Sequence, residues 1–235
     1  MAAELSPEEV IALNRLTLVA RLLAGTAHDL NNALMIIGGS AELLAGLGEP
    51  GDAGRRAVDR IQANATRASD AIQELMHFAR DRGDTSGAVS LRDVVSRAVR
   101  MRGFAARRAG IVLAFDAASL PQAVVEGISG QLLQAVLDLL INAEQAIHGG
   151  ADATVTIEVA EAPDHALVRI IDNGRGIRDV ERAFDPFVTT RPVPDATGLG
   201  LAAARYIARA HGGDVTLEAR SPGSCATLRL PRHRK

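Results

Sequence analysis

The sequence predicts an α+β protein, in which an N-terminal antiparallel helical hairpin is followed by an α/β sandwich with a mixed sheet. Two observations lead to this prediction. Apolar residues recur at helical spacing in the first third of the chain, whereas short alternating runs and further helices follow it. The 235 residues are enough for two modest domains with separate cores. We expect a hairpin at 1–82, a linker at 83–89 and a second domain at 90–235.

Two apolar stripes predict the helical hairpin. Between residues 8 and 47, apolar side chains follow one another at steps of three or four, which is the spacing of one helix face. The members of this stripe are Leu16, Val19, Leu23, Ala27, Leu30, Leu34, Ile37, Ala41 and Leu44. Residues 48–52 interrupt the pattern, and a second stripe runs through 58–79. Such a hairpin buries its stripe either in a four-helix bundle with a second copy or against the rest of its own chain.

Caps, alternation and turn residues predict the remaining elements. Ser90 is expected to cap a helix that runs toward Gly110, and Ser129 to cap a strongly apolar helix that ends at Gly149 and Gly150. Strands are expected at 111–115, 154–159, 166–171, 214–217 and 226–230, an irregular stretch at 172–197, a helix at 199–210 and a turn at 221–223. Helices grouped beside these strands favour an α+β sandwich.

Composition excludes several classes of protein. The formal net charge of -2 gives no general reason to expect nucleic-acid binding. Cys225 is the only cysteine, which excludes an intramolecular disulfide and a cysteine-based zinc site. The acidic N-terminus is unlike a secretory signal, and no apolar run reaches the roughly 18 residues of a membrane span. We therefore expect a soluble cytoplasmic chain that does not insert into membranes.

Two separated pieces of the second part carry unusual chemistry. The segment LLINAEQA, residues 139–146, offers the amide oxygen of Asn142 from an apolar helix, which suits a magnesium ion bound to phosphates. Taken alone, this piece is better explained as an ordinary polar position on an amphipathic helix. The segment DNGRGI, residues 172–177, places Asp172 at a strand end before two glycines that let the backbone approach a flat ligand. By itself, DNG is also a common turn.

Two further pieces follow in the same part of the chain. The segment AFDPFVTTR, residues 183–191, places two phenylalanines in a loop, where a simple hydrophobic anchor is the alternative interpretation. The segment TGLGL, residues 197–201, leads into a helix, where glycines expose backbone N–H groups and the helix start favours anions. A lone GxG is weak evidence, but four pieces in this order are more specific.

In this order the four pieces resemble the N, G1, F and G2 boxes of the histidine-kinase ATP-binding domain. That domain belongs to the superfamily of gyrase, MutL and the heat-shock chaperone ATPases. The resemblance spans about residues 90 to 232 and implies ATP and Mg²⁺ as cofactors, with Asn142 coordinating the metal and Asp172 binding the adenine amino group. The other implied cofactor-binding residues are Gly174 and Gly176 at the adenine, Thr197, Gly198, Leu199 and Gly200 in a lid over the phosphates, and Arg191 as a further phosphate contact.

Two residues depart from the pattern of that family. Ala196 stands where a further glycine is frequent, which would stiffen the lid. Asp138 stands where an asparagine is frequent, one turn before Asn142, and would place a carboxylate near the metal. Neither change removes a core nucleotide contact.

The segment AHDLNNAL, residues 27–34, places polar residues inside the first helical stripe. His28, Asn31, Asn32 and Met35 lie three or four residues apart, so they share a face that is rotated away from the stripe. Glycines at 25, 38 and 39 would leave room for another domain to approach. An isolated histidine in such a place is more often a solvated side chain.

Together with the nucleotide motifs, this segment resembles the H-box of histidine kinases, in the spelling of nitrogen-regulation-type and hybrid sensor kinases. The resemblance implies that His28 is the phosphoacceptor and that Nε2 of its neutral ring attacks the γ-phosphate. It implies that Asp29 holds the tautomer and acts as a base, and that Asn32 orients a water toward a phosphoaspartate on the partner. Ala33 replaces the proline of many relatives.

The resemblance predicts a dimeric histidine kinase core that autophosphorylates on His28 and passes the phosphoryl group to an aspartate of a response-regulator receiver domain. Phosphatase activity is a further hypothesis. One alternative is a histidine phosphotransfer protein that no longer uses ATP, and another is a non-catalytic dimeric scaffold gated by ATP. An ATP-driven DNA clamp leaves AHDLNNAL unexplained. The signal would arrive through the first twenty residues, a partner protein or an additional sensor segment.

Overall fold

The computed structural model describes residues 5–46, 51–80, 85–118, 120–147, 152–177, 179–189 and 196–233, without the side chains of residues 24, 25, 28, 29 and 80. Its contacts divide the chain into two compact units. One contains residues 19–80, and the other contains residues 1–18 together with 81–235. The predicted helical hairpin and the predicted α/β domain are both confirmed. The functional domain boundaries expected from the sequence stay predictions.

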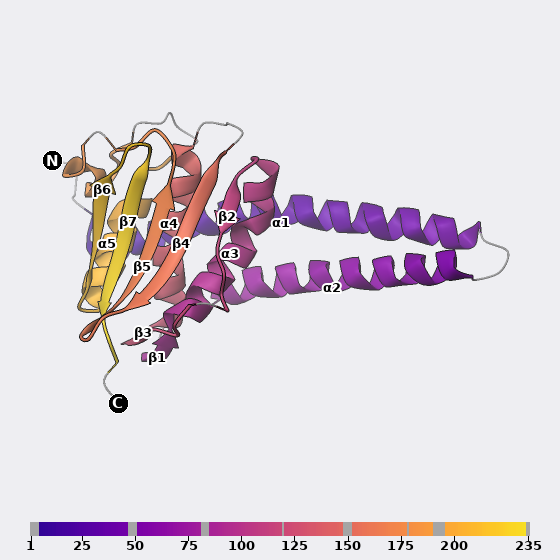
Figure 1. The fold of residues 1–235 in the computed structure, drawn as a ribbon, viewed down its shortest axis with the longest axis horizontal. Coiled ribbons are helices and arrows are strands. Elements are labelled where there is room, and N and C mark those ends of the chain that lie inside the picture. The colour runs from indigo at the N-terminus through magenta and orange to yellow at the C-terminus, as the bar shows by residue number, and fades with distance from the viewer. Residues whose placement is uncertain are drawn as a thin grey trace. The chain divides into compact units, whose positions relative to one another are not determined.

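The hairpin is built from α1 (Pro7–Ala45) and α2 (Asp52–Arg80), which run antiparallel (Figure 1). Both helices were expected, but residues 47–50 of the predicted hairpin loop lie outside the described part of the chain. No member of the predicted stripe on α1 is buried: Leu23 and Leu34 are 51% and 61% exposed, and Leu30 is half-buried. The buried face of α1 is an adjacent one, which includes Leu22 and Ala33. A single partner helix is too narrow to cover a stripe of this width, so apolar surface remains on α1.

A five-stranded mixed sheet forms the centre of the second unit, with strand order β2-β4-β5-β7-β6 (Figure 1). The strands are β2 (Val112–Ala114), β4 (Thr154–Glu161), β5 (His165–Asp172), β6 (Asp214–Ala219) and β7 (Ser224–Pro231). β2 pairs parallel to β4, and the other pairs are antiparallel. Buried and half-buried residues alternate along β4 and β5, so that one sheet face is packed against helices.

Three helices accompany this sheet: α3 (Leu91–Arg108), α4 (Ser129–Ala146) and α5 (Gly200–Ala210). α4 packs against α5, α3 and strand β5, and most of its side chains are buried. Its leucines supply much of the apolar core, namely Leu132, Leu133, Leu137, Leu139 and Leu140. A helix that is apolar on nearly every side is stable only when other elements surround it.

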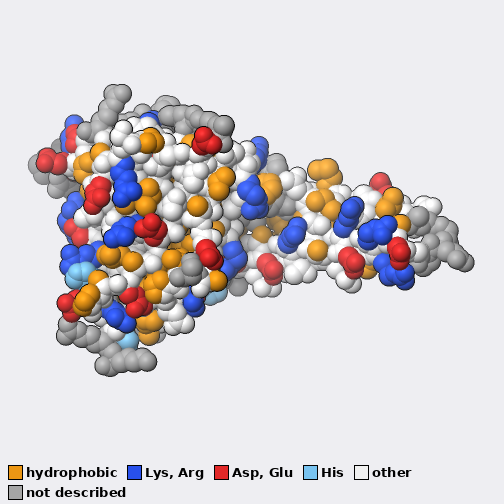
Figure 2. Space-filling model, in the orientation of Figure 1, with side chains coloured by type: hydrophobic (Ala, Val, Ile, Leu, Met, Phe, Trp, Pro, Cys, Tyr) orange, Lys and Arg blue, Asp and Glu red, His pale blue; other side chains and the backbone are white. Residues whose placement is uncertain are grey.

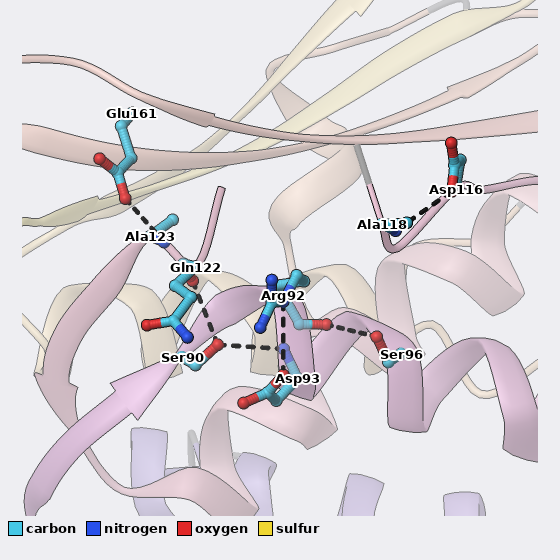
Figure 3. A network of polar contacts seen from close by, with 9 residues as sticks. All are labelled: Ser90, Arg92, Asp93, Ser96, Asp116, Ala118, Gln122, Ala123 and Glu161. Atoms are coloured by element: carbon cyan, nitrogen blue, oxygen red, sulfur yellow. Dashed lines mark hydrogen bonds and ion pairs between the residues drawn. The ribbon is translucent and has the colours of Figure 1, made fainter. Parts of the chain in front are cut away.

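A second, two-stranded sheet was not expected. It pairs β1 (Gly87–Ser90) with β3 (Val124–Gly127), so the segment 83–89, which was predicted to be a linker, enters a strand at Gly87. Strands of four residues carry too little alternation to be recognised alone, and their partner lies far away in the sequence. The bend before β3 places Ala123 at φ 49, where its N–H donates to Glu161 Oε1 at 2.8 Å (Figure 3).

Ser90 caps α3 as predicted. Its Oγ accepts a hydrogen bond from the Asp93 N–H at 3.3 Å and donates to the Gln122 carbonyl at 3.2 Å (Figure 3). The cap therefore satisfies an N–H group of the first helical turn and also fastens α3 to the strand that follows Gln122.

The predicted cap of α4 is wrong. Ser129 is the first helical residue, and the capping position belongs to Ile128, which makes no side-chain hydrogen bond. The N–H of Ile128 instead donates to His211 Nε2 at 3.0 Å, so a side chain from the end of α5 replaces a local cap. The helix also ends at Ala146 rather than at the two glycines, because the N–H of Arg175 occupies the Ala146 carbonyl at 3.0 Å. Residues 148–150 lie outside the described chain.

Other boundaries differ by a few residues. The strand expected at 111–115 is the shorter β2, and a short 3₁₀-helix, η1 (Arg182–Phe184), forms within the stretch expected to be irregular. The turn at 221–223 joins β6 and β7, with the Arg220 N–H donating to the Gly223 carbonyl at 2.9 Å. Basic and acidic side chains are intermixed on the surface drawn in Figure 2. None of the helices in the described ranges combines the length and the hydropathy of a membrane span.

A buried ion pair joins α3 to α4. Arg102 contacts both carboxylate oxygens of Glu144, with the shortest distance 2.6 Å from Nη2 to Oε2, and the two side chains are only 14% and 6% exposed. Two parallel N–H···O contacts from a guanidinium form the strongest common type of ion pair. Removing one partner leaves the other charge buried without compensation.

We predict that Arg102→Met lowers the free energy of unfolding by about 3 kcal/mol, since Glu144 would stay buried without its partner. The matched control is Arg169→Met, because Arg169 lies 3.5 Å from Glu158 in a pair whose side chains are 41% and 46% exposed. Its loss should cost at most about 1 kcal/mol. Urea denaturation of both variants measures the difference, and equal losses would contradict this account.

Asp214, at the start of β6, gathers several donors. Its Oδ1 accepts from Arg205 Nε at 2.9 Å and from the Val215 N–H at 2.9 Å, and Arg209 Nε lies at 3.3 Å. Burial by itself would raise the pKa of this carboxyl group, but the hydrogen bonds from Arg205, Val215 and Arg209 outweigh burial and hold the pKa below its ordinary 3.8. The cluster fastens the end of α5 to the edge strand.

A lowered pKa in the folded state means that the Asp214 carboxylate stabilises the fold above about pH 4 and loses this effect as the pH falls through the folded pKa. We predict that Asp214→Asn lowers the free energy of unfolding by up to about 1 kcal/mol at pH 7, since the group is partly solvated. Denaturation at pH 7, 5, 4 and 3 should show the gap between wild type and variant closing only below about pH 4. A gap that stays constant down to pH 3 would contradict the assignment.

Candidate functional site

Asp172 lies at the end of β5 and is almost fully buried, with its carboxylate held by two donors. Ser224 Oγ donates to Oδ2 at 2.5 Å, and the Gly174 N–H donates to Oδ1 at 2.8 Å. The first bond crosses from β7 to β5, where the two residues are direct partners in the sheet. Because both oxygens are engaged, the carboxylate has one orientation, and its remaining lone pairs can accept a hydrogen bond from a ligand.

The glycines beside Asp172 allow very close packing. A Cβ atom on Gly174 would lie 2.4 Å from the Ala146 carbonyl oxygen, so the loop after β5 can contact the end of α4 only with glycine at this position. Gly176 has φ +72, a left-handed conformation that favours glycine. The expected conformational role of both glycines is therefore compatible with the geometry, whereas their role at an adenine ring stays a prediction.

The second group of predicted residues lies at the start of α5. Gly198 has φ +69, and a Cβ atom there would lie 2.5 Å from the carbonyl carbon of Phe187. The Phe187 N–H donates to the Gly198 carbonyl at 3.0 Å, which ties the two segments together. Leu199 is buried, and Gly200 begins α5 without a side-chain cap. Unpaired N–H groups at such a helix start favour an anion.

Gly200 also approaches α4. A Cβ atom on Gly200 would lie 3.3 Å from Asp138 Oδ1, so Asp138 lies against the start of α5. At the C-terminal end of α4, Ala146 contacts the loop that follows Asp172. Asp138 lies at the middle of α4, eight helical steps before Ala146, or about 12 Å along the axis. The second half of α4 therefore links the carboxylate acceptor Asp172 to the anion-favouring start of α5, an arrangement suited to an elongated ligand with two chemically different ends.

Asn142 lies between these two ends. It is half-buried, whereas residues 139–141, 143 and 144 around it are buried, so its amide is the polar group that α4 leaves accessible midway. Within the described ranges, no group of three or more His, Cys, Asp or Glu side chains could hold a metal ion. A magnesium ion at this site would therefore need ligand phosphates beside one amide oxygen, which is a common coordination for Mg²⁺.

The 3₁₀-helix η1 is anchored by an aromatic contact. The Arg205 guanidinium of α5 lies 4.3 Å from the ring centroid of Phe184 in η1. Since Arg205 also pairs with Asp214, one arginine joins η1, α5 and β6. This favours the anchor interpretation for Phe184, while Phe187 is 61% exposed.

Several predicted residues cannot be compared with the structure. The side chains of His28 and Asp29 and the whole of Arg191 lie outside the described chain. Asn32 is half-buried on α1. Gly38 and Gly39 have no atom within 4 Å of an added Cβ, so space is open at these positions. Thr197 is half-buried beside Gly198.

Three residues of the site were missed in the sequence. Ser224 orients Asp172, and Gly223 has φ +87, so close to β5 that a Cβ atom would collide with the Asp172 carbonyl oxygen. Asn173 Nδ2 donates to the Asp152 carbonyl at 2.6 Å, and its Oδ1 accepts from the Thr154 N–H at 3.0 Å. Gly223 and Ser224 belong to the run SPGS, residues 221–224, which by itself indicates only an ordinary turn. Their roles become visible once the pairing of β7 with β5 is known.

Two family models match the chain. Residues 127–234 match the histidine kinase-, DNA gyrase B- and HSP90-like ATPase family, and residues 18–83 match the His Kinase A phospho-acceptor domain. The first range contains the nucleotide motifs, and the second contains AHDLNNAL.

Among the curated proteins, the chain is similar to sensor histidine kinases. The chain is 29% identical over 221 residues to the sensor histidine kinase ZraS of Salmonella typhi, covering 92% of this chain and 46% of the relative. It is 31% identical over 229 residues to the probable sensor histidine kinase TcrY of Mycobacterium tuberculosis, again covering 92% and 46%. The chain thus spans about half the length of these relatives.

Solved structures agree on the fold. A mycobacterial sensor histidine kinase, MprB, aligns with a TM-score of 0.55 at 28% identity, covering 64% of this chain and 100% of that one. The histidine kinase ThkA, solved in complex with the response regulator TrrA, aligns with a TM-score of 0.53 at 22% identity, covering 93% of this chain and 63% of that one, which shows the fold alone. The chain thus carries a His Kinase A phospho-acceptor domain followed by a histidine kinase-, DNA gyrase B- and HSP90-like ATPase domain, and over both domains it matches sensor histidine kinases.

Proposed function

We propose that this chain binds Mg²⁺-ATP, autophosphorylates on His28 and transfers the phosphoryl group to an aspartate of a response-regulator receiver domain. The observation that carries the proposal is the fixed carboxylate of Asp172, held by Ser224 and the Gly174 N–H in a chain that also has a phospho-acceptor hairpin. A buried, oriented acceptor suits the exocyclic amino group of adenine.

The described residues divide the work of binding. Asp172 would accept from the adenine amino group, while the N–H groups at the start of α5, beside Gly198 and Gly200, would bind phosphate oxygens. Asn142 would hold the magnesium ion, which when bound offsets charge on the phosphates. Arg191 would add a further phosphate contact.

The chemistry then requires a neutral imidazole. Nε2 of His28 would form a bond to the γ-phosphorus as the bond to the β–γ bridging oxygen breaks, so that ADP leaves with the electron pair. Asp29 would accept a hydrogen bond from Nδ1–H, hold the required tautomer and take up the proton as charge develops on the ring. The phosphoryl group would then pass from Nε2 to a carboxylate oxygen of the receiver aspartate.

Several features support the proposed partners. ThkA is solved with a response regulator, and this chain has the same fold. Apolar side chains of α1 remain exposed in a single chain, among them Leu23, Leu34 and Leu43, and a second copy in a four-helix bundle would cover them. Asn32 would orient a water toward the receiver phosphoaspartate, which gives phosphatase activity. Dependence on ATP favours a cytoplasmic site of action, and the nitrogen-regulation subtype stays a prediction.

Labelling with γ-labelled ATP and Mg²⁺ tests the assigned phosphoacceptor. We predict acid-labile label on the wild-type chain and none on His28→Ala, since a phosphohistidine bond needs the imidazole nitrogen that the variant lacks. The matched control is His77→Ala, which removes an exposed histidine of α2 and should keep the label. Label that survives on His28→Ala would contradict the assignment.

The labelling assay, together with a titration that measures nucleotide binding, separates the alternatives. Asn142→Ala should lose the label because Mg²⁺-ATP binding is weakened. Wild-type chain that binds no nucleotide would favour a phosphotransfer protein, whereas chain that binds ATP without becoming labelled would favour an ATP-gated scaffold.

The role of Ser224 gives a second prediction. Ser224→Ala should weaken ATP binding by about tenfold, since the Asp172 carboxylate loses one of its two orienting donors. Isothermal titration measures the dissociation constant. Ser96→Ala is the control, because Ser96 Oγ bonds only to the Arg92 carbonyl within α3. Equal affinities for the two variants would exclude an orienting role for Ser224.

A further inference from the structure

The first three turns or so of α1, as far as Leu18, belong to the same compact unit as the ATP-binding domain. Residues 1–18 cluster with residues 81–235, whereas the rest of α1 clusters with α2. Val10 is fully buried in a cluster with Leu199, which directly precedes α5, and with Ala202 and Ala203 of α5. Leu5, Ile11 and Tyr206 pack around this cluster. The segment Leu5–Leu18, called the docking segment below, therefore covers the residues that begin α5.

A buried polar pair joins the docking segment to α4. Asn14 Nδ2 donates to Asp138 Oδ2 at 2.6 Å, and both side chains are more than nine-tenths buried. The other oxygen, Asp138 Oδ1, is the atom that lies against Gly200. One carboxylate thus contacts the docking segment with one oxygen and the first residue of α5 with the other. A buried carboxylate that loses a donor is destabilised, so the bond from Asn14 helps to hold Asp138 in place.

A second polar contact lies one turn away on α4. Gln134 Nε2 donates to the Ile11 carbonyl at 2.9 Å. Among the described residues, Gln134 Oε1 is buried and has no hydrogen-bond partner. A buried acceptor of this kind regains a partner when water reaches it, so part of the free energy lost on undocking is recovered. The contact is therefore specific and also able to open.

We propose that Asn14 is a positioning residue for the nucleotide site. Through Asp138 it holds Gly200 and the phosphate-binding start of α5 in place, so that displacement of the docking segment weakens Mg²⁺-ATP binding. This inference rests on the proposed nucleotide site. It means that any movement imposed on the beginning of α1 reaches the phosphate-binding residues directly, within one compact unit and without passing through the rest of the hairpin.

The test reverses the pair in the full chain. Asn14→Asp places two carboxylates together, and we expect about tenfold weaker Mg²⁺-ATP binding by titration and faster amide exchange over residues 199–204 in nucleotide-free protein. The double variant Asn14→Asp with Asp138→Asn restores one amide donor and one carboxylate, so both readouts should return to within about twofold of wild type. Ala12→Asp, which adds the same charge at an exposed position of α1, is the matched control.

Three outcomes would overturn the proposal. Asn14→Asp could equal Ala12→Asp in affinity and in exchange, the double variant could fail to restore either readout, or exchange could rise with no change in affinity. Wild-type chain that binds no nucleotide would defeat the proposed function instead. In that case the nucleotide-free exchange data still decide whether Asn14 and Asp138 hold the start of α5.

Discussion

The burial of α4 is the constraint on which the rest of the ATP-binding unit depends. Its apolar residues need partners on nearly every side, which the sheet, α3 and α5 supply. Three polar side chains are buried with them, and each has a partner on another helix: Gln134 and Asp138 contact the docking segment, and Glu144 contacts α3. Because an unpaired buried charge is costly, these contacts fix how α4 lies. The position of α4 in turn determines where the residues of the candidate site lie.

Close approach of backbones is the second requirement of the site. Gly174 allows the loop after β5 to contact the end of α4, and Gly198 allows the segment before α5 to contact Phe187. Any side chain at either position would separate segments that must meet. The glycines thus serve the packing of the protein as well as the approach of a ligand. The glycines of these motifs are therefore needed for close packing and not only for backbone flexibility.

In the proposed site, the residues that bind the phosphates must be held in place and must also be able to move when the docking segment moves. The hydrogen bonds to Asp172 come from its sheet partner Ser224 and from Gly174 two residues further along the chain, which would make the proposed adenine end rigid. The start of α5 instead depends on a helix from the beginning of the chain, through Val10 and Asn14. In the proposed site, fixed recognition of the base combined with phosphate contacts that depend on a displaceable helix would let the chain change its affinity for the nucleotide. Figure 1 shows the elements that carry the two ends, α4, α5 and β5.

By itself, the sequence determined the class of elements and the family. Helical spacing predicted both long helices, Ser90 predicted its cap, and the order of the four motifs predicted the ATP-binding fold, because these signals are local. Only the tertiary structure decided the pairing of β1 with β3, the end of α4 at Ala146 and the role of Ser224. It also decided the contact between Asn14 and Asp138, which are 124 positions apart. No local pattern encodes such contacts, since they arise when segments distant in the chain share one buried space.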